Sequence, residues 1–114
     1  MASKSGEYSE NTWDEFGVEH RWKNTQLLDS TMTDRGTLVE MVYRPHWGVA
    51  CYMDNAIQSC EVDEHIYHES LVHPVMSSSG DKKHAMIIGG GEGATAREVL
   101  KWSVEKVDMF EWDK

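Results

Sequence analysis

The chain is poor in several residue types that mark particular classes of protein. It has two cysteines and two prolines in 114 residues, too few for the disulfide framework of a small secreted domain or for a proline-rich linker. We therefore predict that Cys51 and Cys60 are reduced. Every apolar run is far shorter than the ~20 residues of a membrane helix, and the first ten residues lack the apolar stretch of a signal peptide. We expect no membrane partner and a cytoplasmic location.

Basic residues are also scarce. Eleven lysines and arginines face twenty acidic residues, which gives a formal net charge of -9. Nucleic-acid-binding proteins carry basic patches, so this balance argues against a nucleic-acid partner. An acidic surface attracts cationic ligands, although the same charge also serves solubility alone.

The length suits one modest core, and the pattern predicts an α+β to α/β chain in five segments. These are a disordered tail (1–12), an N-terminal antiparallel β-hairpin domain (13–62), a connecting helix (63–76), a linker (77–83) and a partial Rossmann-like nucleoside-binding domain (84–114). In the hairpin domain, "TLVEMVY" and "WGVACYM" are rich in β-branched and aromatic residues. "RPH" and "DNA" supply turns between strands.

The segment "DEHIYHESLVHPVM" begins with acids, as helices do. Tyr67, Leu71 and Val75 recur every four residues along one helix face, and Pro74 predicts an end or kink late in the run. After the linker, "HAMIIGG", "GATAREVLKW" and "VEKVDMFEW" read as strand, helix and strand. This is the opening β-α-β unit of a Rossmann-like parallel sheet. One such unit cannot cover both faces of a sheet, so either other chains complete it or the chain is a piece of a longer protein, which we favour.

A glycine turn carries the main functional signal. Gly89, Gly91 and Ala94 match G-x-G-x-x-A, and Glu111 follows at close to the usual ~20-residue spacing. The glycines let the backbone approach a nucleoside, and Glu111 can accept hydrogen bonds from ribose hydroxyls; the alternative is a tight turn with an incidental acid. Glu92 within the turn would repel a pyrophosphate. It would attract a sulfonium or an amine, which favours an S-adenosyl-type nucleoside over NAD.

Two long stretches resemble one family. "MDNAIQSCEVDEHIYHESLVHP" followed by "IIGGGEGATAREVLKWSVEKVDMFEWD" is similar to the polyamine aminopropyltransferases, the spermidine/spermine synthases. "GGGEGATAREVL" and "YHESLVHP" are most similar to thermospermine synthase-like members, in which Glu replaces the commoner Asp. The resemblance covers residues 47–113 and extends weakly back to Trp13. It implies decarboxylated S-adenosylmethionine as co-substrate, polyamine ligands and no permanently bound cofactor.

The same resemblance assigns roles to individual residues. It places the nucleoside ligand against Gln58 and the turn glycines (Gly89, Gly90, Gly91 and Gly93), the aminopropyl ammonium against Glu92, and the ribose hydroxyls against Glu111. Tyr67 and His68 would line the junction with the amine acceptor, and Trp13 would form a wall of the acceptor pocket. Structural roles remain open beside these: Tyr67 as core, His68 as a capping or solvated helix residue, and Gln58 as a strand-edge polar residue.

The family's catalytic acid lies in a "DSSD"-like loop beyond Lys114, so the resemblance places no catalytic residue within the chain and predicts weak or no activity alone. "DNAIQ" puts Asn55 where the family has a turn glycine, and Asn tolerates the positive φ required there. The strand "GTLVEMVY" lacks the family's glutamine. Other readings are a non-catalytic interaction module and a fragment of a SAM-dependent methyltransferase, and unpaired sheet edges predict a homo-oligomer.

We predict no metal site. "HESLVH" differs from the zinc-protease motif because His68 and His73 are five residues apart, ~140° around a helix. His65 and His68 remain a chance pair of possible ligands.

Overall fold

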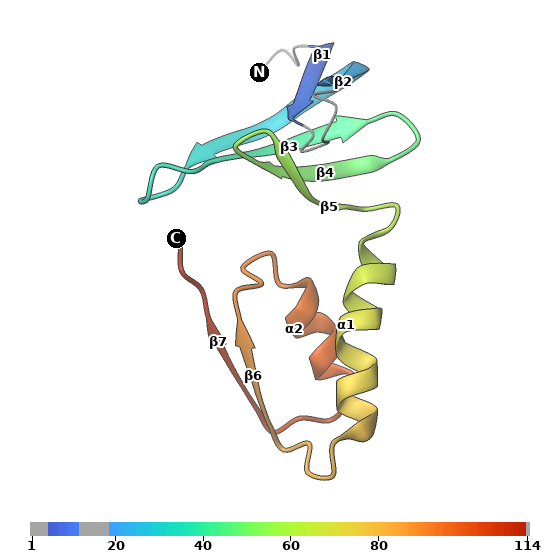
Figure 1. The fold of residues 1–114 in the computed structure, drawn as a ribbon, viewed down its shortest axis with the longest axis vertical. Helices are drawn as coiled ribbons and strands as arrows, with labels where there is room; N and C mark the ends of the chain where they lie inside the picture. The colour runs from blue at the N-terminus through green and yellow to red at the C-terminus, as the bar shows by residue number, and fades with distance from the viewer. Residues whose placement is uncertain (1–4, 12–18, 114) are drawn as a thin grey trace. The chain divides into compact units, whose positions relative to one another are not determined.

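The computed structural model describes residues 5–11 and 19–113, which divide into two compact units, Met1–Val62 and Asp63–Lys114. The first unit contains β1 (Ser5–Asn11), β2 (Glu19–Met32), β3 (Leu38–Arg44), β4 (Gly48–Met53) and β5 (Ala56–Cys60). The second contains α1 (Glu64–Ser78), β6 (His84–Ile88), α2 (Ala94–Leu100) and β7 (Lys106–Phe110) (Figure 1). Among the described residues, no helix has the length and apolarity needed to cross a membrane.

The first unit is a five-stranded antiparallel sheet in which each strand pairs with the next along the chain. The tight turn between β4 and β5 uses Asp54 and Asn55, with φ of 49° and 64°. Two consecutive residues at positive φ suit the twist of a two-residue hairpin. The prediction that Asn55 can replace the turn glycine is therefore confirmed.

The core of this unit follows the period-two alternation of its strands. Val42, Ala50, Tyr52 and Cys60 are buried together. Cys60 of β5 lies opposite Ala50 of β4, whereas Cys51, the residue after Ala50, lies opposite Ser59. Successive side chains of a strand point to opposite faces, so the two thiols do not meet, and neither cysteine is in a disulfide.

The prediction of a disordered tail over 1–12 is wrong for residues 5–11. These residues form β1, which pairs with β2 from Ser5 opposite Gln26 to Asn11 opposite Glu19. A polar composition suggested disorder, but strand pairing uses backbone groups that every residue except proline provides. Trp13 lies outside the described residues.

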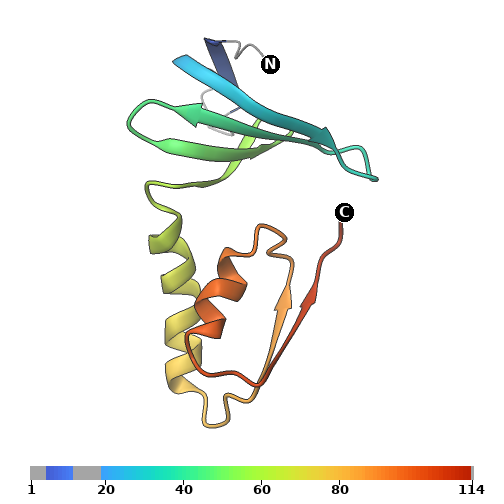
Figure 2. The same cartoon turned by 180° about the vertical axis from the view of Figure 1, so that it is seen from behind.

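The second unit begins with a helix and continues as a parallel β-α-β unit. β6 and β7 pair in parallel, with His84 opposite Lys106 and Ile88 opposite Phe110, and α2 joins them. The two helices and one face of the strand pair share a core of Val72, Met76, Ile87 and Val99, and both views show α1 and α2 side by side (Figures 1 and 2). The predicted opening unit of a Rossmann-like sheet is confirmed.

Helix α1 differs from its prediction in two respects. It continues through Pro74 to Ser78, so the irregular segment starts at residue 79. Its buried face consists of His68, Val72 and Met76, while the predicted apolar face is turned outward, with Tyr67, Leu71 and Val75 exposed. The two faces are one residue out of step along the helix, and the packing of Val72 and Met76 onto β6 and α2 selects between them.

Candidate functional site

The glycine turn between β6 and α2 has a backbone that only glycine adopts readily. Gly89, Gly90 and Gly93 have φ of 79°, 78° and 82°, in the region that side chains disfavour. The amide of Gly89 donates to the carbonyl of Phe110, and the amide of Gly93 donates to the carbonyl of Gly90. The turn is thus fastened to the end of β7 and leads directly into α2.

Glu111, the residue after β7, lies against this turn. Its Oε2 accepts a hydrogen bond of 2.8 Å from the amide of Gly91. A Cβ at position 91 would lie 2.8 Å from the same oxygen, so the close approach depends on glycine. The amides of Asp113 and Trp112 donate to Oε1, and these bonds, with that from Gly91, lower the pKa of Glu111 below its ordinary value. A hydrogen-bonded carboxylate is therefore fixed at the turn.

Glu92 contacts a buried histidine of α1. Its Oε1 lies 3.0 Å from Nε2 of His68, whose side chain is 2% exposed. The other ring nitrogen, Nδ1, lies 2.7 Å from the carbonyl oxygen of Glu64 and 2.9 Å from its Oε2. Burial by itself lowers the pKa of His68, but the hydrogen bonds to Glu92 and Glu64 outweigh it and the net shift is upward. Acceptors at both nitrogens favour the imidazolium form.

Arg97 of α2 extends this charged network. Its Nη2 lies 2.8 Å from Oε2 of Glu64, and its Nε lies 2.9 Å from Oε1 of Glu98. The hydrogen bond from Arg97 is the largest cause of the lowered pKa of Glu64. Opposite charges therefore alternate from Arg97 through Glu64 and His68 to Glu92. They connect α2, α1 and the glycine turn.

The structure brings together most of the predicted site residues. The turn glycines, Glu92, Glu111, His68 and Tyr67 all belong to the second unit. Tyr67 is 66% exposed and stands edge-on to the His68 ring, with centroids 5.1 Å apart, so the alternative that it is core is wrong. Gln58 belongs to the first unit, where its exposed side chain donates to the carbonyl of Ala56. Its contact with a nucleoside stays a prediction, as does that of Trp13.

Sequence reasoning missed Glu64 and Arg97 as members of this network. In the sequence, Glu64 is one of the acids expected at a helix N-terminus, yet it also lies four residues before His68, and an i, i+4 acid and histidine are neighbours on a helix. That spacing was a usable signal for one of the contacts. Arg97 had none, because its partner Glu64 lies 33 residues away in the chain.

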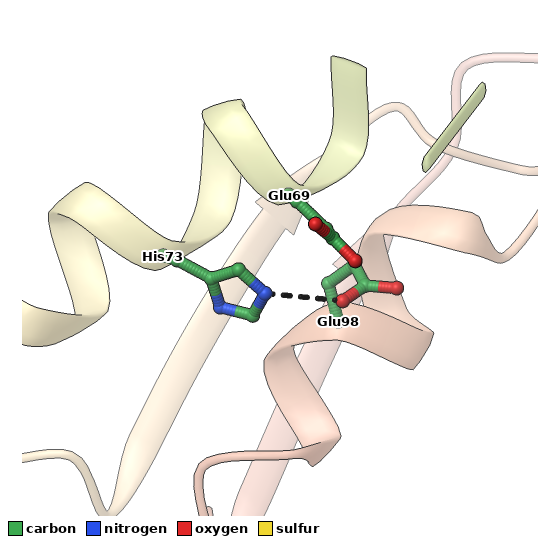
Figure 3. A group of neighbouring side chains, drawn as sticks. All are labelled: Glu69, His73 and Glu98. Atoms are coloured by element: carbon green, nitrogen blue, oxygen red, sulfur yellow. Dashed lines mark ion pairs between the residues drawn. The ribbon is translucent and has the colours of Figure 1, made fainter. Parts of the chain in front are cut away.

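A second cluster, formed by Glu69, His73 and Glu98, has possible metal ligands within 4.8 Å of one another (Figure 3). Its hydrogen bonds argue against a metal. The indole of Trp102 donates to Nδ1 of His73 at 2.9 Å, so in a neutral ring the proton sits on Nε2, which faces Glu98 at 3.3 Å. A metal at Nε2 needs the lone pair that this proton occupies.

The negative charge of Glu98 is already balanced by two neighbouring cations. Lys101 and Arg97 both pair with this buried carboxylate, and these interactions, Lys101 first, lower its pKa to about 2. The cluster is best described as an ion network that joins α1 to α2.

Comparison with known proteins gives the class of the chain. A family profile described as "Spermine/spermidine synthase domain" matches residues 64–114. The polyamine aminopropyltransferase of Sulfolobus acidocaldarius is 53% identical over 82% of this chain and 30% of its own length, and that of Prochlorococcus marinus is 49% identical over 90% and 37%. A spermidine synthase solved with the transition-state analogue AdoDATO matches 95% of this chain and 36% of its own, with a TM-score of 0.83 and 34% identity.

The spermidine synthase of Thermotoga maritima matches almost as well, with a TM-score of 0.80 and 34% identity over 95% of this chain and 38% of its own. The chain belongs to the polyamine aminopropyltransferase family. It spans between 23% and 37% of the length of the curated relatives with which it was compared.

Proposed function

We propose that the second unit carries the part of an aminopropyltransferase site that binds decarboxylated S-adenosylmethionine. The observation that carries this proposal is the placement of two carboxylates on one glycine turn. Glu111 rests against the amide of Gly91, and Glu92 rests against His68. In the family reaction an aminopropyl group moves from this nucleoside to putrescine or spermidine.

The chemistry of each carboxylate suits one end of that ligand. Each oxygen of an ionised carboxylate accepts more than one hydrogen bond, so Glu111 retains acceptor capacity for ribose hydroxyls beside its bonds to the backbone. Glu92 is 42% exposed and offers its charge to the ammonium of the aminopropyl chain. A pyrophosphate would meet two negative charges at this turn, which disfavours a dinucleotide. The transition-state analogue AdoDATO, with which a related spermidine synthase was solved, supports the same ligand class.

Within this proposal the described residues bind and orient the ligand. The amine acceptor attacks the carbon beside the sulfonium, the carbon–sulfur bond breaks, and methylthioadenosine leaves. The acceptor must lose a proton before it attacks. The carboxylate expected to act as the base lies in the segment of the family that follows this region. We therefore propose weak or no turnover by the chain alone. Self-association through unpaired sheet edges and a cytoplasmic location remain part of the proposal.

Calorimetric titration of the purified chain with decarboxylated S-adenosylmethionine and with methylthioadenosine tests the assignment. We expect saturable binding of both ligands. Glu92→Gln should weaken the first ligand by about tenfold, ~1.4 kcal/mol, because it loses a charge-assisted contact with the ammonium. Methylthioadenosine has no ammonium and should bind both proteins alike.

Glu105→Gln is the matched control. Glu105 pairs with Lys83 just before the parallel strands begin, at the end of the strand pair away from the turn. The Glu105→Gln substitution removes one negative charge, as Glu92→Gln does, but leaves the glycine turn unchanged. Equal weakening by both variants, or no binding of either ligand, would contradict the proposal. Tighter binding of S-adenosylmethionine itself would indicate a methyltransferase fragment, and absence of all ligand binding would leave the interaction module.

A further inference from the structure

The contacts of His68 determine which of its ring nitrogens keeps a proton. Nδ1 lies 2.7 Å from the backbone carbonyl oxygen of Glu64, which can only accept a hydrogen bond, so Nδ1 must be the donor. A neutral His68 ring therefore carries its proton on Nδ1 and a lone pair on Nε2. The proton that the ring gains or loses with pH is the one on Nε2, which faces Glu92.

This assignment makes the contact between His68 and Glu92 depend on one proton. When the proton is present, Nε2 donates to Oε1 of Glu92 at 3.0 Å. When it is lost, a lone pair faces a carboxylate oxygen, and two acceptors at this distance repel each other. The neutral ring therefore releases Glu92, the carboxylate that we assign to the ligand ammonium.

The side chain of Glu64 is shared between His68 and Arg97. Its Oε2 lies 2.9 Å from Nδ1 of His68 and 2.8 Å from Nη2 of Arg97. The hydrogen bond from Arg97 is the largest cause of the lowered pKa of Glu64, so this carboxylate is ionised at any pH at which His68 titrates. Its charge stabilises the imidazolium, and Arg97 opposes that effect because a second cation binds the same oxygen.

Three elements place charged or titratable groups around the His68 ring. Arg97 is fixed by two bonds, because its Nε donates to Glu98 while its Nη2 donates to Glu64. The groups that face the ring, directly or through one partner, are Glu64 and Tyr67 of α1, Glu92 of the glycine turn and Arg97 of α2.

We propose that Glu64 and Arg97 are positioning residues of the nucleoside site and act on it through His68. Glu64 strengthens the hold of the ring on the proton that engages Glu92, and Arg97 weakens that hold. The pair thus sets how readily Glu92 becomes available to the ligand ammonium, and neither residue needs to contact the ligand. This inference rests on the proposed function, because it requires that Glu92 binds an ammonium.

Substitution at either end of the Glu64–Arg97 pair tests the proposal, because the two changes should act in opposite directions. Glu64→Gln removes the carboxylate that favours the imidazolium, and Arg97→Met removes the cation that opposes it. The pH midpoint of His68 is measured by NMR of its ring nitrogens in the ligand-free protein. We expect a lower midpoint in Glu64→Gln and a higher midpoint in Arg97→Met.

The wild-type chain provides a test that needs no variant. Above its midpoint the neutral His68 ring should carry its proton on Nδ1, and the nitrogen chemical shifts distinguish a protonated from an unprotonated ring nitrogen. A neutral ring with its proton on Nε2 would overturn the proposal.

Affinity for decarboxylated S-adenosylmethionine should follow the two midpoints. One pH unit below the wild-type midpoint about a tenth of His68 is neutral, so the competent fraction responds directly to a change in the midpoint. At that pH, calorimetry should show binding about threefold tighter in Glu64→Gln and about threefold weaker in Arg97→Met. Well above the midpoint both variants should approach the wild type. Methylthioadenosine lacks the ammonium and should bind all three proteins alike.

The signs of these changes separate the proposed role from two others. A direct effect of the charges on the ligand would weaken binding in Glu64→Gln and tighten it in Arg97→Met, the reverse of our expectation. An ion pair with a merely structural role would weaken binding in both variants, and would do so for methylthioadenosine as well. Either result would overturn the proposal.

Lys101→Met is the matched control for Arg97→Met. Lys101 follows α2 and pairs with the buried carboxylate of Glu98, as Arg97 does. The substitution removes one positive charge beside the same carboxylate and leaves the pair of Glu64 and Arg97 in place. It should leave the midpoint of His68 unchanged, and a rise equal to that of Arg97→Met would overturn the role of Arg97.

The two measurements keep this inference separate from the proposed function. If the wild-type chain bound neither nucleoside while the NMR midpoints moved in opposite directions, the proposed function would fail and the control of the His68 proton would stand. Affinities that did not follow opposed midpoints would overturn the inference, because the proton would then not govern Glu92. Midpoints that moved in the same direction would overturn it as well.

Discussion

At the scale of the residue, the most specific prediction concerns His68, because both of its ring nitrogens face hydrogen-bond acceptors. Glu92 lies at Nε2 and Glu64 at Nδ1, with Arg97 paired to Glu64 from α2 and the ring of Tyr67 alongside. An imidazolium at this position gives Glu92 a cationic partner from within the protein. A ligand ammonium must then share or displace that partner.

We predict that affinity for decarboxylated S-adenosylmethionine rises as the pH rises through the pKa of His68 in the folded protein. The pKa of His68 is raised above its ordinary value near 6.5, so the proton leaves only as pH rises through that higher value, and Glu92 is then released for the ligand. Titration in two buffers of different ionisation heat should detect a proton released on binding. In His68→Gln the rise should vanish, and a rise of the same size in that variant would contradict the explanation.

The same shift affects stability with the opposite sign. A group whose pKa is higher in the folded state stabilises the fold fully below its unfolded pKa, and this contribution is lost as pH rises through the folded value. At low pH the imidazolium of His68 therefore holds α1 and the glycine turn together most firmly. At the same low pH the ligand ammonium competes least well for Glu92. Binding and local stability are coupled through one proton.

At the scale of the element, the glycine turn and the end of β7 form one unit. We predict that Gly91→Ala weakens decarboxylated S-adenosylmethionine and methylthioadenosine alike, at least about tenfold, because the new Cβ would meet Oε2 of Glu111 at 2.8 Å. Because this carboxylate is the far end of an exposed side chain, it can move aside, and the unfolding free energy should fall by less than about 1 kcal/mol. Titration calorimetry and urea unfolding measure the two effects.

Gly80→Ala is the control for this variant. Gly80 lies in the irregular segment after α1, and a Cβ there would meet nothing within 4 Å. It should change neither affinity nor stability by more than about 0.5 kcal/mol. If Gly91→Ala bound both nucleosides normally, Glu111 would not be the ribose contact.

Helix α1 shows why an element can be predicted while its orientation is not. Two faces one residue out of step contain apolar side chains, Tyr67, Leu71 and Val75 on one and Val72 and Met76 on the other. Periodicity favoured the first. The second is buried because it packs onto Ile87 and Val99, and because His68 finds hydrogen-bond acceptors there that offset its burial.

At the scale of the whole molecule, the two units have separate cores, and we predict that they unfold in separate transitions. In the first unit the buried guanidinium of Arg44 lies 3.5 Å from the Trp22 ring centroid and donates to the hydroxyl of Tyr52 at 2.7 Å. Arg44→Met should destabilise that unit alone by about 2–4 kcal/mol, since it removes a cation–π contact and a buried hydrogen bond.

Met76→Ala should destabilise the second unit alone by about 2–5 kcal/mol, because it leaves a cavity between α1 and β6. Val75→Ala, on the exposed face of the same helix, serves as its control and should change little. Scanning calorimetry of the three variants distinguishes the outcomes. A single transition that moved with both Arg44→Met and Met76→Ala would show that the units fold as one.

The sequence by itself determined those features that depend on residues near one another in the chain. Strand alternation, the Asp54–Asn55 turn, the positive-φ glycines and the β-α-β order follow from local backbone preferences, and the family follows from motifs in a fixed order. It did not determine that residues 5–11 pair with β2, because pairing uses backbone groups that composition does not report.

Only the tertiary structure decided how the charged residues are combined. Glu92 faces His68, 24 residues earlier, Arg97 reaches Glu64, 33 residues earlier, and Glu111 rests on Gly91, 20 residues earlier. Trp102 fixes the tautomer of His73 across 29 residues and so argues against a metal in a cluster whose composition suits one. Such contacts depend on how the two helices pack on β6 and β7, and no local pattern encodes the distance between side chains that packing brings together.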